Sequence, residues 1–414
     1  MKKKILIIGG GLTGLTAAYE LAKNEISVTV AEKECELGGL LGSFRINDYY
    51  LEKTYHHIFR TDKSIIELIR ELGLANRLRW YESSIGLYYD GKMYPFVTPI
   101  DLLKFKPLGI VDKIRMGLAA VYLQKDIKWK KYLKTPAYKW MKKWCGERAY
   151  QVVWKPLLVG KFGDKYKRVS MAWLWARIHT RGGSKDADGK ERLGYMDGGF
   201  GLIIDRLRGE ITKMGGVIKT KTKIVHADLK QDIKDYDAVI STIPSKGIDY
   251  LGAVNVVFTS KQNLSQYYWH NINDIESPFL AFIQHTNLVG YCQYGGDFVY
   301  YMGAYIPHDH KLFTESDENV YNEFFDYLKK IYPEFDRKKI IKKFLFRFKN
   351  AQHVVTTNFQ LPITNYELNK VKVYSANFAQ IFPEDRGTNY AVREGIKVAN
   401  LVMEDLKKNS ETIF

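Results

Sequence analysis

Three glycines near the start of the chain have the spacing of a turn that binds phosphate. Gly9, Gly11 and Gly14 form a G-x-G-x-x-G pattern between an apolar run and a helical one. In such a turn the second glycine lets the backbone approach a pyrophosphate, and the N–H groups at the helix start bind its oxygens. The pattern therefore predicts a dinucleotide site, to which Leu12 and Thr13 of the same turn contribute.

A carboxylate follows at the position where such a site needs one. Glu32 closes the second apolar run, and its side chain can accept hydrogen bonds from both hydroxyls of a ribose. A negative charge there also disfavours a ribose that carries a 2′-phosphate. Together the glycine turn and Glu32 predict a bound dinucleotide rather than a glycine-rich turn without a ligand.

The next residues resemble the glycine-pair signature of the glutathione-reductase-like flavoproteins. They run from Lys33 to the pair Gly38-Gly39, and Leu40 stands where many relatives have an arginine. In those proteins the segment wraps back over the pyrophosphate. The resemblance therefore implies FAD rather than NAD, with Lys33, Gly38, Gly39 and Leu40 as cofactor contacts. Backbone contacts suffice for this role, although Leu40 cannot supply the charge of an arginine.

Further segments resemble the FAD-dependent amine oxidase superfamily, which includes protoporphyrinogen oxidase and phytoene desaturase. They are residues 194–200, 215–224, 237–244 and 383–391, together with Asn377. The resemblance implies that the backbone near Ile224 touches the adenine. It also implies that a final strand, ending near Asn377, brings the chain to the flavin.

The last of these segments supplies four expected flavin contacts: Arg386, Gly387, Thr388 and Asn389. By resemblance, a helix begins here beneath the pyrimidine end of the isoalloxazine. The partial positive charge of a helix N-terminus would stabilise the anion that develops at flavin N1/O2 on reduction. No cysteine or histidine lies where some amine oxidases attach flavin covalently, and Cys292 is the last cysteine. We therefore expect non-covalent FAD.

Two histidines and a lysine are candidate catalytic groups. His56 and His57 lie in a stretch that resembles the G-x-H-x-F segment of UDP-galactopyranose mutases, which are redox-neutral flavoenzymes with the same FAD architecture. Either histidine could bond the flavin or act as a general acid or base, with His57 slightly favoured, or both could be packed histidines. Amine oxidases often place a lysine near flavin N5, usually to hold a water. Lys161 is a candidate for that role, and a surface lysine is the alternative.

Three functions are compatible with these motifs. The first is an FAD-dependent oxidoreductase that takes a hydride from a C–N or C–C bond at flavin N5, on a hydrophobic or anionic substrate. The second is a redox-neutral enzyme of the mutase type that acts on a nucleotide sugar. The third is a flavin-binding protein without catalysis. The 383–391 segment resembles oxidases and desaturases more than mutases, so it favours the first.

Strand-like and helical patterns alternate near both ends of the chain, which predicts an α/β fold. We expect a glutathione-reductase-like FAD-binding Rossmann domain with an inserted, discontinuous substrate domain of mixed sheet and helices. The FAD-binding domain would comprise residues 1–75, 190–250 and 365–414, and the substrate-binding domain residues 76–189 and 251–364. The patterns predict strands over 4–8, 27–32, 217–225, 237–241 and 371–376, and helices over 12–23, 64–72, 136–153, 200–214, 317–331 and 388–407. An aromatic run predicts a strand pair that faces a cavity or packs in a sheet: Tyr291, Tyr294, Phe298, Tyr300, Tyr301 and Tyr305.

The formal net charge of +17 is concentrated in one segment. Residues 101–150 hold thirteen lysines and arginines against four acidic residues, interleaved with tryptophan and tyrosine. This mixture suits an anionic membrane surface or an anionic substrate, such as a nucleotide sugar or a polyprenyl phosphate. It is also compatible with a solvated helical surface. We expect no nucleic acid partner, because no recognised binding module accompanies the charge.

The cysteine and histidine content argues against metal centres and disulfides. The three cysteines lie far apart, which favours a reducing compartment, and His308-Asp309-His310 alone does not make a metal site. No window of about 18 apolar residues is present. We expect a cytoplasmic protein, either free or on the inner face of the cell membrane, with a small-molecule substrate and an oligomeric state left open.

Overall fold

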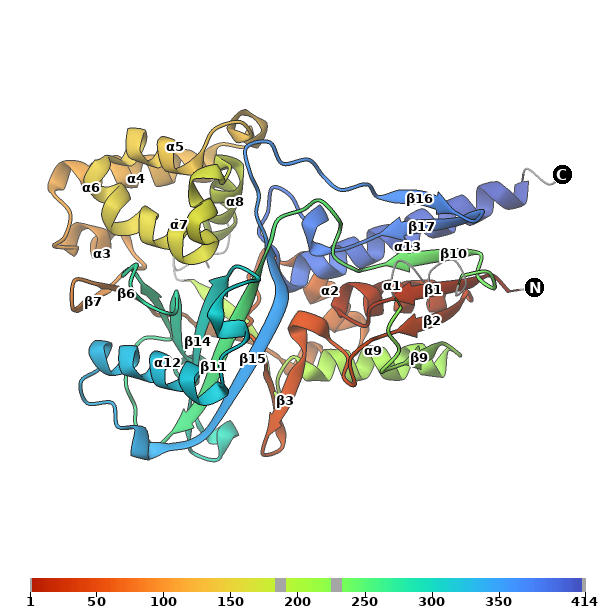
Figure 1. The fold of residues 1–414 in the computed structure, drawn as a ribbon, viewed down its shortest axis with the longest axis horizontal. Coiled ribbons are helices and arrows are strands. Elements are labelled where there is room, and N and C mark those ends of the chain that lie inside the picture. The colour runs from red at the N-terminus through yellow and green to blue at the C-terminus, as the bar shows by residue number, and fades with distance from the viewer. Residues whose placement is uncertain (1, 183–190, 225–232, 412–414) are drawn as a thin grey trace.

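Two large β-sheets form the framework of the molecule (Figure 1). The computed structural model describes residues 2–182, 191–224 and 233–411. The first sheet has six strands in the order β16-β17-β10-β1-β2-β9. Their bounds are β1 Lys4–Ile8, β2 Ser27–Ala31, β9 Val217–Lys219, β10 Ala238–Ser241, β16 Asn365–Leu368 and β17 Val371–Ser375. The expected mixed α/β fold is confirmed.

Strand β1 lies at the centre of this sheet because its residues are apolar on both faces. It pairs in parallel with β2 and β10. Ile5 and Ile7 pack toward helix α1 (Leu12–Lys23), whereas Leu6 and Ile8 pack on the opposite face. A strand covered on both sides needs such a continuous apolar run.

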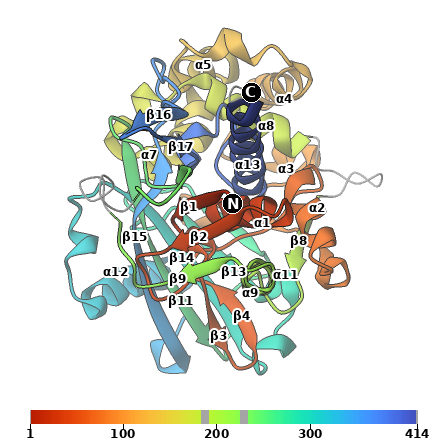
Figure 2. The same ribbon diagram turned by 90° about the vertical axis from the view of Figure 1, so that its right-hand side faces the viewer.

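Long helices cover one face of the first sheet. Helix α13 (Thr388–Glu411) lies against α1, and α2 (Lys63–Glu71) packs beside α13 (Figure 2). Helix α9 (Gly201–Lys213) contacts α1 from another side. The predicted bounds of β1 and α1 are confirmed. The strand predicted over 217–225 ends at Lys219, and residue 225 lies outside the described residues. The predicted domain boundary at 189/190 also lies outside them.

The second sheet has seven strands in the order β15-β11-β14-β13-β12-β6-β7. Their bounds are β6 Ile85–Tyr89, β7 Lys92–Pro95, β11 Tyr250–Ser260, β12 Trp269–Ile272, β13 Ala281–Gln284, β14 Phe298–Ile306 and β15 Ile340–His353. Helix α12 (Asp317–Ile331) covers one face and has the predicted bounds. The domain division stays a prediction, although the strands of this sheet come from segments assigned to the inserted part.

The predicted aromatic strand pair is only half correct. Phe298, Tyr300, Tyr301 and Tyr305 lie in β14, but Tyr291 and Tyr294 lie at a 3₁₀ turn over Cys292–Tyr294. Gly295 and Gly296 adopt φ angles of 73° and 78°, which end that turn and break any strand. The actual partners of β14 are β11 and β13.

A cluster of helices forms a third region beside the second sheet (Figure 1). It comprises α3 Pro99–Lys104, α4 Ile110–Lys125, α5 Ala137–Cys145, α6 Glu147–Ala149, α7 Lys155–Phe162 and α8 Met171–Gly182. The single helix predicted over 136–153 is wrong. Gly146 has a φ of 98°, which a right-handed helix does not allow, so α5 ends before it and α6 begins after it.

The remaining elements connect these regions. They are the hairpin of β3 Ser43–Ile46 with β4 Tyr49–Glu52, the pair of β5 Leu78–Glu82 with β8 Arg192–Met196, and the short helix α11 Thr286–Val289. Among the described helices, none combines the length and the apolar character needed to cross a bilayer.

Glu52, at the end of β4, ties this hairpin to the 194–200 segment. Its carboxylate is buried and accepts hydrogen bonds from the Tyr195 hydroxyl at 2.7 Å and from the Phe200 N–H at 2.7 Å. Burial raises the pKa of Glu52 to about 7, although both hydrogen bonds oppose the shift. At a pH between the Glu52 pKa of the unfolded chain and that of the folded protein, Glu52 is therefore protonated in the folded state but ionised in the unfolded state.

The stability of the fold should consequently fall as the pH rises from about 4.5 to about 7, because the buried Glu52 must ionise. Glu52→Gln should remove roughly 3 kcal/mol of this pH-dependent loss. Denaturant unfolding at several pH values measures the slope. Glu334→Gln, at an exposed position, is the control and should keep the wild-type slope. An unchanged slope in Glu52→Gln would contradict this assignment.

Candidate active site

The glycine turn between β1 and α1 has the geometry of a phosphate cradle. Gly9 has a φ of 107°, and a Cβ on Gly14 would lie 2.1 Å from the Gly9 carbonyl oxygen, so the fold itself requires both glycines. Gly11 differs, because its φ is −73° and a Cβ there would meet nothing closer than 3.9 Å. Neither conformation nor packing within the chain demands glycine at position 11. The open space is the volume that a pyrophosphate would fill.

Glu32 lies at the edge of this cradle. Its buried carboxylate accepts hydrogen bonds from the Gly10 N–H at 2.7 Å and the Glu34 N–H at 2.9 Å. These bonds orient the carboxylate beside the turn, where the resemblance expects a ribose. Lys33 is exposed and its ammonium pairs with Glu34 at 3.1 Å, so its side chain lies in solvent.

The glycine pair closes over the turn, as expected. The N–H of Gly38 donates to the Gly10 carbonyl at 2.8 Å, and Gly38 forms a parallel bridge with Gly11. The Leu40 carbonyl accepts a hydrogen bond from the Thr54 hydroxyl at 3.1 Å. Since Thr54 also lines the main cavity, this bond connects the phosphate turn to the cavity.

Two predicted cofactor contacts lie at other places in the first sheet. Ile224, beyond β9, packs against the apolar cluster that contains Leu6 and Ile8. The buried amide of Asn377 donates to the Ile243 carbonyl at 3.0 Å and the Ser245 hydroxyl at 2.9 Å, and its oxygen accepts from the Ala379 N–H. The Asn377 side chain therefore joins the ends of β10 and β17.

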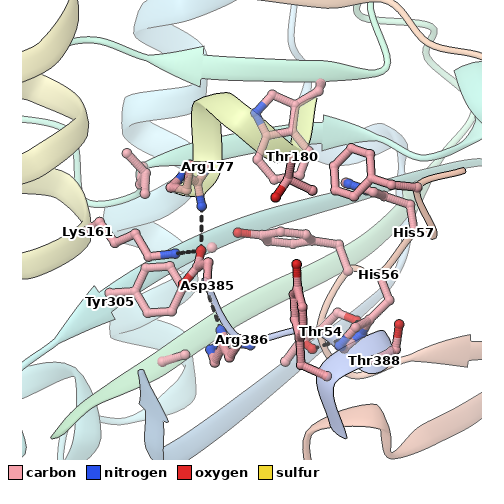
Figure 3. Close-up of a pocket in the computed structure, with 18 of the residues that line it drawn as sticks. Thr54, His56, His57, Lys161, Arg177, Thr180, Tyr305, Asp385, Arg386 and Thr388 are labelled. Carbon is pink, nitrogen blue, oxygen red and sulfur yellow. Dashed lines mark hydrogen bonds and ion pairs between the residues drawn. The ribbon is translucent and has the colours of Figure 1, made fainter. Parts of the chain in front are cut away.

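The main cavity lies between the second sheet, helices α7 and α8 of the helical region, and the start of α13 (Figure 3). It encloses about 200 Å³. Several predicted site residues meet in its wall although they are distant in sequence: His56, His57, Lys161, Arg386, Gly387, Thr388 and Asn389. The phosphate turn supplies none of the described lining residues, so the candidate site has two parts joined through Thr54.

A buried ion cluster forms one wall of this cavity. Asp385 accepts hydrogen bonds from Lys161 Nζ at 2.6 Å and Arg177 Nη1 at 2.5 Å, and Trp173 Nε1 donates to its other oxygen at 3.2 Å. Burial opposes the ionisation of Asp385, but Lys161 and Arg177 outweigh it and hold its pKa well below the usual range. The alternative of a surface lysine is wrong, because Lys161 is only 5% exposed. Burial lowers the pKa of Lys161, and Asp385 opposes that shift.

Arg386 and the start of α13 form the neighbouring wall. Arg386 Nη2 donates to the Tyr305 hydroxyl at 2.7 Å, whereas its buried Nε has no partner among the described residues. Helix α13 begins at Thr388, and its first residues line the cavity. The first N–H groups of a helix have no partner within the helix and are available to a ligand. Asn389 Oδ1 accepts from the Ser64 N–H at 2.9 Å and so holds α2 beside this helix start.

The two histidines are placed in the wall but are not poised to titrate near neutral pH. His56 Nδ1 lies 2.8 Å from the Thr54 carbonyl, and His57 Nδ1 lies 3.3 Å from the Tyr268 hydroxyl. Burial lowers the pKa of His56 to about 4 and that of His57 to about 3. Both rings are therefore neutral at pH 7 and suited to hydrogen bonding.

Four charged wall residues escaped the sequence predictions: Asp62, Arg177, Arg181 and Asp385. A signal for two of them was present, because Trp173, Arg177 and Arg181 recur every four residues on α8 and so share one face. Burial raises the pKa of Asp62 to about 6. Asp385 belongs to the 383–391 segment, but its role depends on partners more than two hundred residues away.

The two-part site fits a flavin dinucleotide. The open space at Gly11 suits a pyrophosphate, and the cavity at the start of α13 suits an isoalloxazine, with the orphan Nε of Arg386 available to a ligand oxygen. In the described part of the chain, no cluster of histidine, cysteine and carboxylate side chains could hold a metal ion.

Comparisons with known proteins agree with this geometry. Amine oxidase [flavin-containing] A of Canis lupus familiaris is 24% identical over 267 residues, which cover 58% of this chain and 49% of that protein. Mitochondrial protoporphyrinogen oxidase of Nicotiana tabacum is 30% identical over 122 residues, 29% of this chain and 24% of that protein. The chain thus spans about half, or less, of the length of these curated relatives.

A solved structure shows the same fold over nearly the whole chain. The crystal structure of reduced UDP-galactopyranose mutase superposes with a TM-score of 0.71, covering 97% of this chain and 96% of that one at 15% identity. The family model for flavin-containing amine oxidoreductases matches residues 12–284, more than half of the 414 residues, and it implies a flavin cofactor. The chain therefore belongs to the flavin-containing amine oxidoreductase family.

Proposed function

We propose that the chain binds FAD non-covalently and oxidises an anionic organic substrate. The observation that carries this proposal is the cationic cavity wall at the start of α13. When bound, FAD would supply the acceptor for a hydride from a C–H bond next to nitrogen or carbon, and the substrate would also lose a proton to form a double bond. Family membership supports the flavin, and the open space at Gly11 supports its pyrophosphate.

The chain's own residues would bind the flavin at both ends. The Gly11 turn and Glu32 would hold the adenosine half, and the N–H groups at Thr388 would face the pyrimidine end, where their partial positive charge favours an anion. In the part of the chain that the structure describes, no cysteine lines the cavity. This supports a cofactor that is not attached through sulfur.

The substrate class follows from the charges in the wall. Lys161, Arg177, Arg181 and Arg386 face the cavity, against Asp62 and Asp385. Glu191 lines an adjoining space, and its charge acts on Arg181. Even with Glu191 included, the four cations outnumber the carboxylates. A protonated amine would be repelled there, whereas a carboxylate or phosphate would be attracted. The wall therefore favours an anionic substrate over an amine cation.

The same charge favours a second candidate function, a redox-neutral reaction on a nucleotide sugar. The diphosphate of such a substrate would suit the arginines, and the mutase structure shares the fold. The redox state in which the enzyme is active distinguishes the two candidate functions. An oxidase bleaches its flavin anaerobically with substrate, whereas the mutase reaction would need chemically reduced enzyme and a UDP-sugar.

Purified protein should be yellow, and heat or acid precipitation should release its flavin into the supernatant. Flavin that stays with the precipitate would overturn the non-covalent assignment, and colourless protein that takes up no FAD would overturn the flavin assignment itself. These results do not depend on the substrate, so they test the cofactor separately.

Benzoate and benzylamine test the charge of the cavity, because they share a ring and differ in charge. Benzoate should perturb the flavin absorbance with at least about tenfold higher affinity than benzylamine. Arg181→Met should weaken benzoate binding about tenfold, because it removes one of the four cations. Lys338→Met, at an exposed position outside the cavity lining, is the control. Tighter binding of benzylamine would contradict an anionic substrate.

A further inference from the structure

Helix α4 exposes an apolar face to solvent. Ile110, Ile114, Leu118 and Val121 are between 49% and 66% exposed and follow helical spacing along one side. The opposite side buries Met116, Ala119 and Leu123 against the helical region. A helix that is apolar on both sides normally lies in a protein interior or against another apolar phase. The exposed side of α4 is therefore apolar enough to be expected in contact with another apolar surface.

Neighbouring residues extend this face. Of the seventeen large hydrophobic side chains that the described residues expose, ten lie between positions 100 and 144. They are Ile100, Leu103, Ile110, Val111, Ile114, Leu118, Val121, Tyr122, Ile127 and Trp144. We refer to these ten residues as the α4 face. It lies in the helical region, at the opposite end of the molecule from both termini (Figure 1).

Basic side chains surround the α4 face. Lys104 and Lys106 are exposed just before α4, Lys125 is exposed at its last position, and Lys128 is exposed just after it. Within the described residues, only two of the thirteen cations of residues 101–150 pair with a carboxylate: Lys131 with Asp126 and Lys142 with Glu147. Most of the positive charge is thus left to act on whatever covers the face.

We propose that the α4 face docks on a lipid bilayer that contains anionic headgroups. Apolar side chains would enter the interface between headgroups and acyl chains, while the flanking lysines meet the lipid phosphates and carboxylates. A second copy of this chain is a poorer occupant, because two faces with the same large positive charge would repel each other. Helix α4 also packs on α8, which carries Arg177 and Arg181 of the cavity wall, so docking brings the cavity close to the membrane.

Vesicle flotation tests this proposal on the full-length protein. The protein should float with phosphatidylcholine vesicles that contain phosphatidylserine, and much less with phosphatidylcholine alone. Ile114→Glu/Leu118→Glu should lower the partition about a hundredfold, because two exposed apolar side chains no longer enter the interface. Lys125→Glu/Lys128→Glu should lower it about tenfold or more, and salt should weaken wild-type binding in the same direction.

Matched variants elsewhere separate a specific face from general surface effects. Ile275→Glu/Ile363→Glu changes two apolar residues that are at least as exposed on average, and Lys338→Glu/Lys342→Glu changes two exposed lysines. Both controls should float like the wild type. Absence of flotation with phosphatidylserine, or unchanged flotation of Ile114→Glu/Leu118→Glu, would overturn the proposal. So would a wild-type dimer in sedimentation that Ile114→Glu/Leu118→Glu converts to a monomer, because the face would then join two copies.

Discussion

Replacing Gly11 with alanine is expected to abolish flavin binding while leaving the fold of the flavin-free chain intact. The backbone at Gly11 has an ordinary φ of −73°, and the new Cβ would meet no atom of the chain closer than 3.9 Å. The methyl group would instead fill the space next to the N–H groups that open α1. A pyrophosphate would lose close backbone contact, so flavin affinity should fall by about a hundredfold or more.

Gly14→Ala is the matched comparison for this prediction. A Cβ there would lie 2.1 Å from the Gly9 carbonyl oxygen, so the turn itself must move and the flavin-free protein should also lose stability. Flavin content after purification and the thermal midpoint of the flavin-free forms measure both effects. Gly11→Ala protein that retains its flavin would show that the pyrophosphate does not lie at this turn.

The sequence predicted the first sheet well because its signals are local. The apolar run over 4–8 can only be a strand that is covered on both faces, and glycine spacing fixes the turn that follows it. The helix over 136–153 failed because residue 146 takes a positive φ that helical periodicity does not reveal. Periodicity reports which side of a segment is apolar, but not where the backbone must turn.

The cavity wall could be predicted only in part, because its chemistry depends on contacts between distant segments. His56 and His57, the two candidate histidines, both line the wall, but their depressed pKa values come from burial, which the sequence does not show. Lys161 had no local pattern that separated a buried from a surface lysine. Its role depends on Asp385, and that pairing exists only once α7 packs against the start of α13.

Asp385→Asn should destabilise the protein by about 3–5 kcal/mol, because it leaves two buried cations without their shared counter-charge. Lys161 is 5% exposed and Arg177 is partly buried, so water cannot replace the carboxylate fully. Asparagine has nearly the same shape, which excludes a cavity as the cause. Denaturant unfolding of the variant and the wild type measures the loss.

The double variant Lys161→Met/Asp385→Asn distinguishes lost charge pairing from a general disturbance of the cavity wall. Removing the stranded ammonium should restore a large part of the stability, whereas Lys161→Met alone leaves Asp385 paired with Arg177 and should cost less than Asp385→Asn. The pH dependence of the stability gives a second test. Without Asp385 the pKa of folded-state Lys161 should fall further below its value in the unfolded chain, so the unfolded state binds one more proton than the folded state. The stability of Asp385→Asn should therefore rise as the pH rises. Additive losses in the double variant, with no gain at high pH, would show that Asp385 supports the wall by packing rather than by charge.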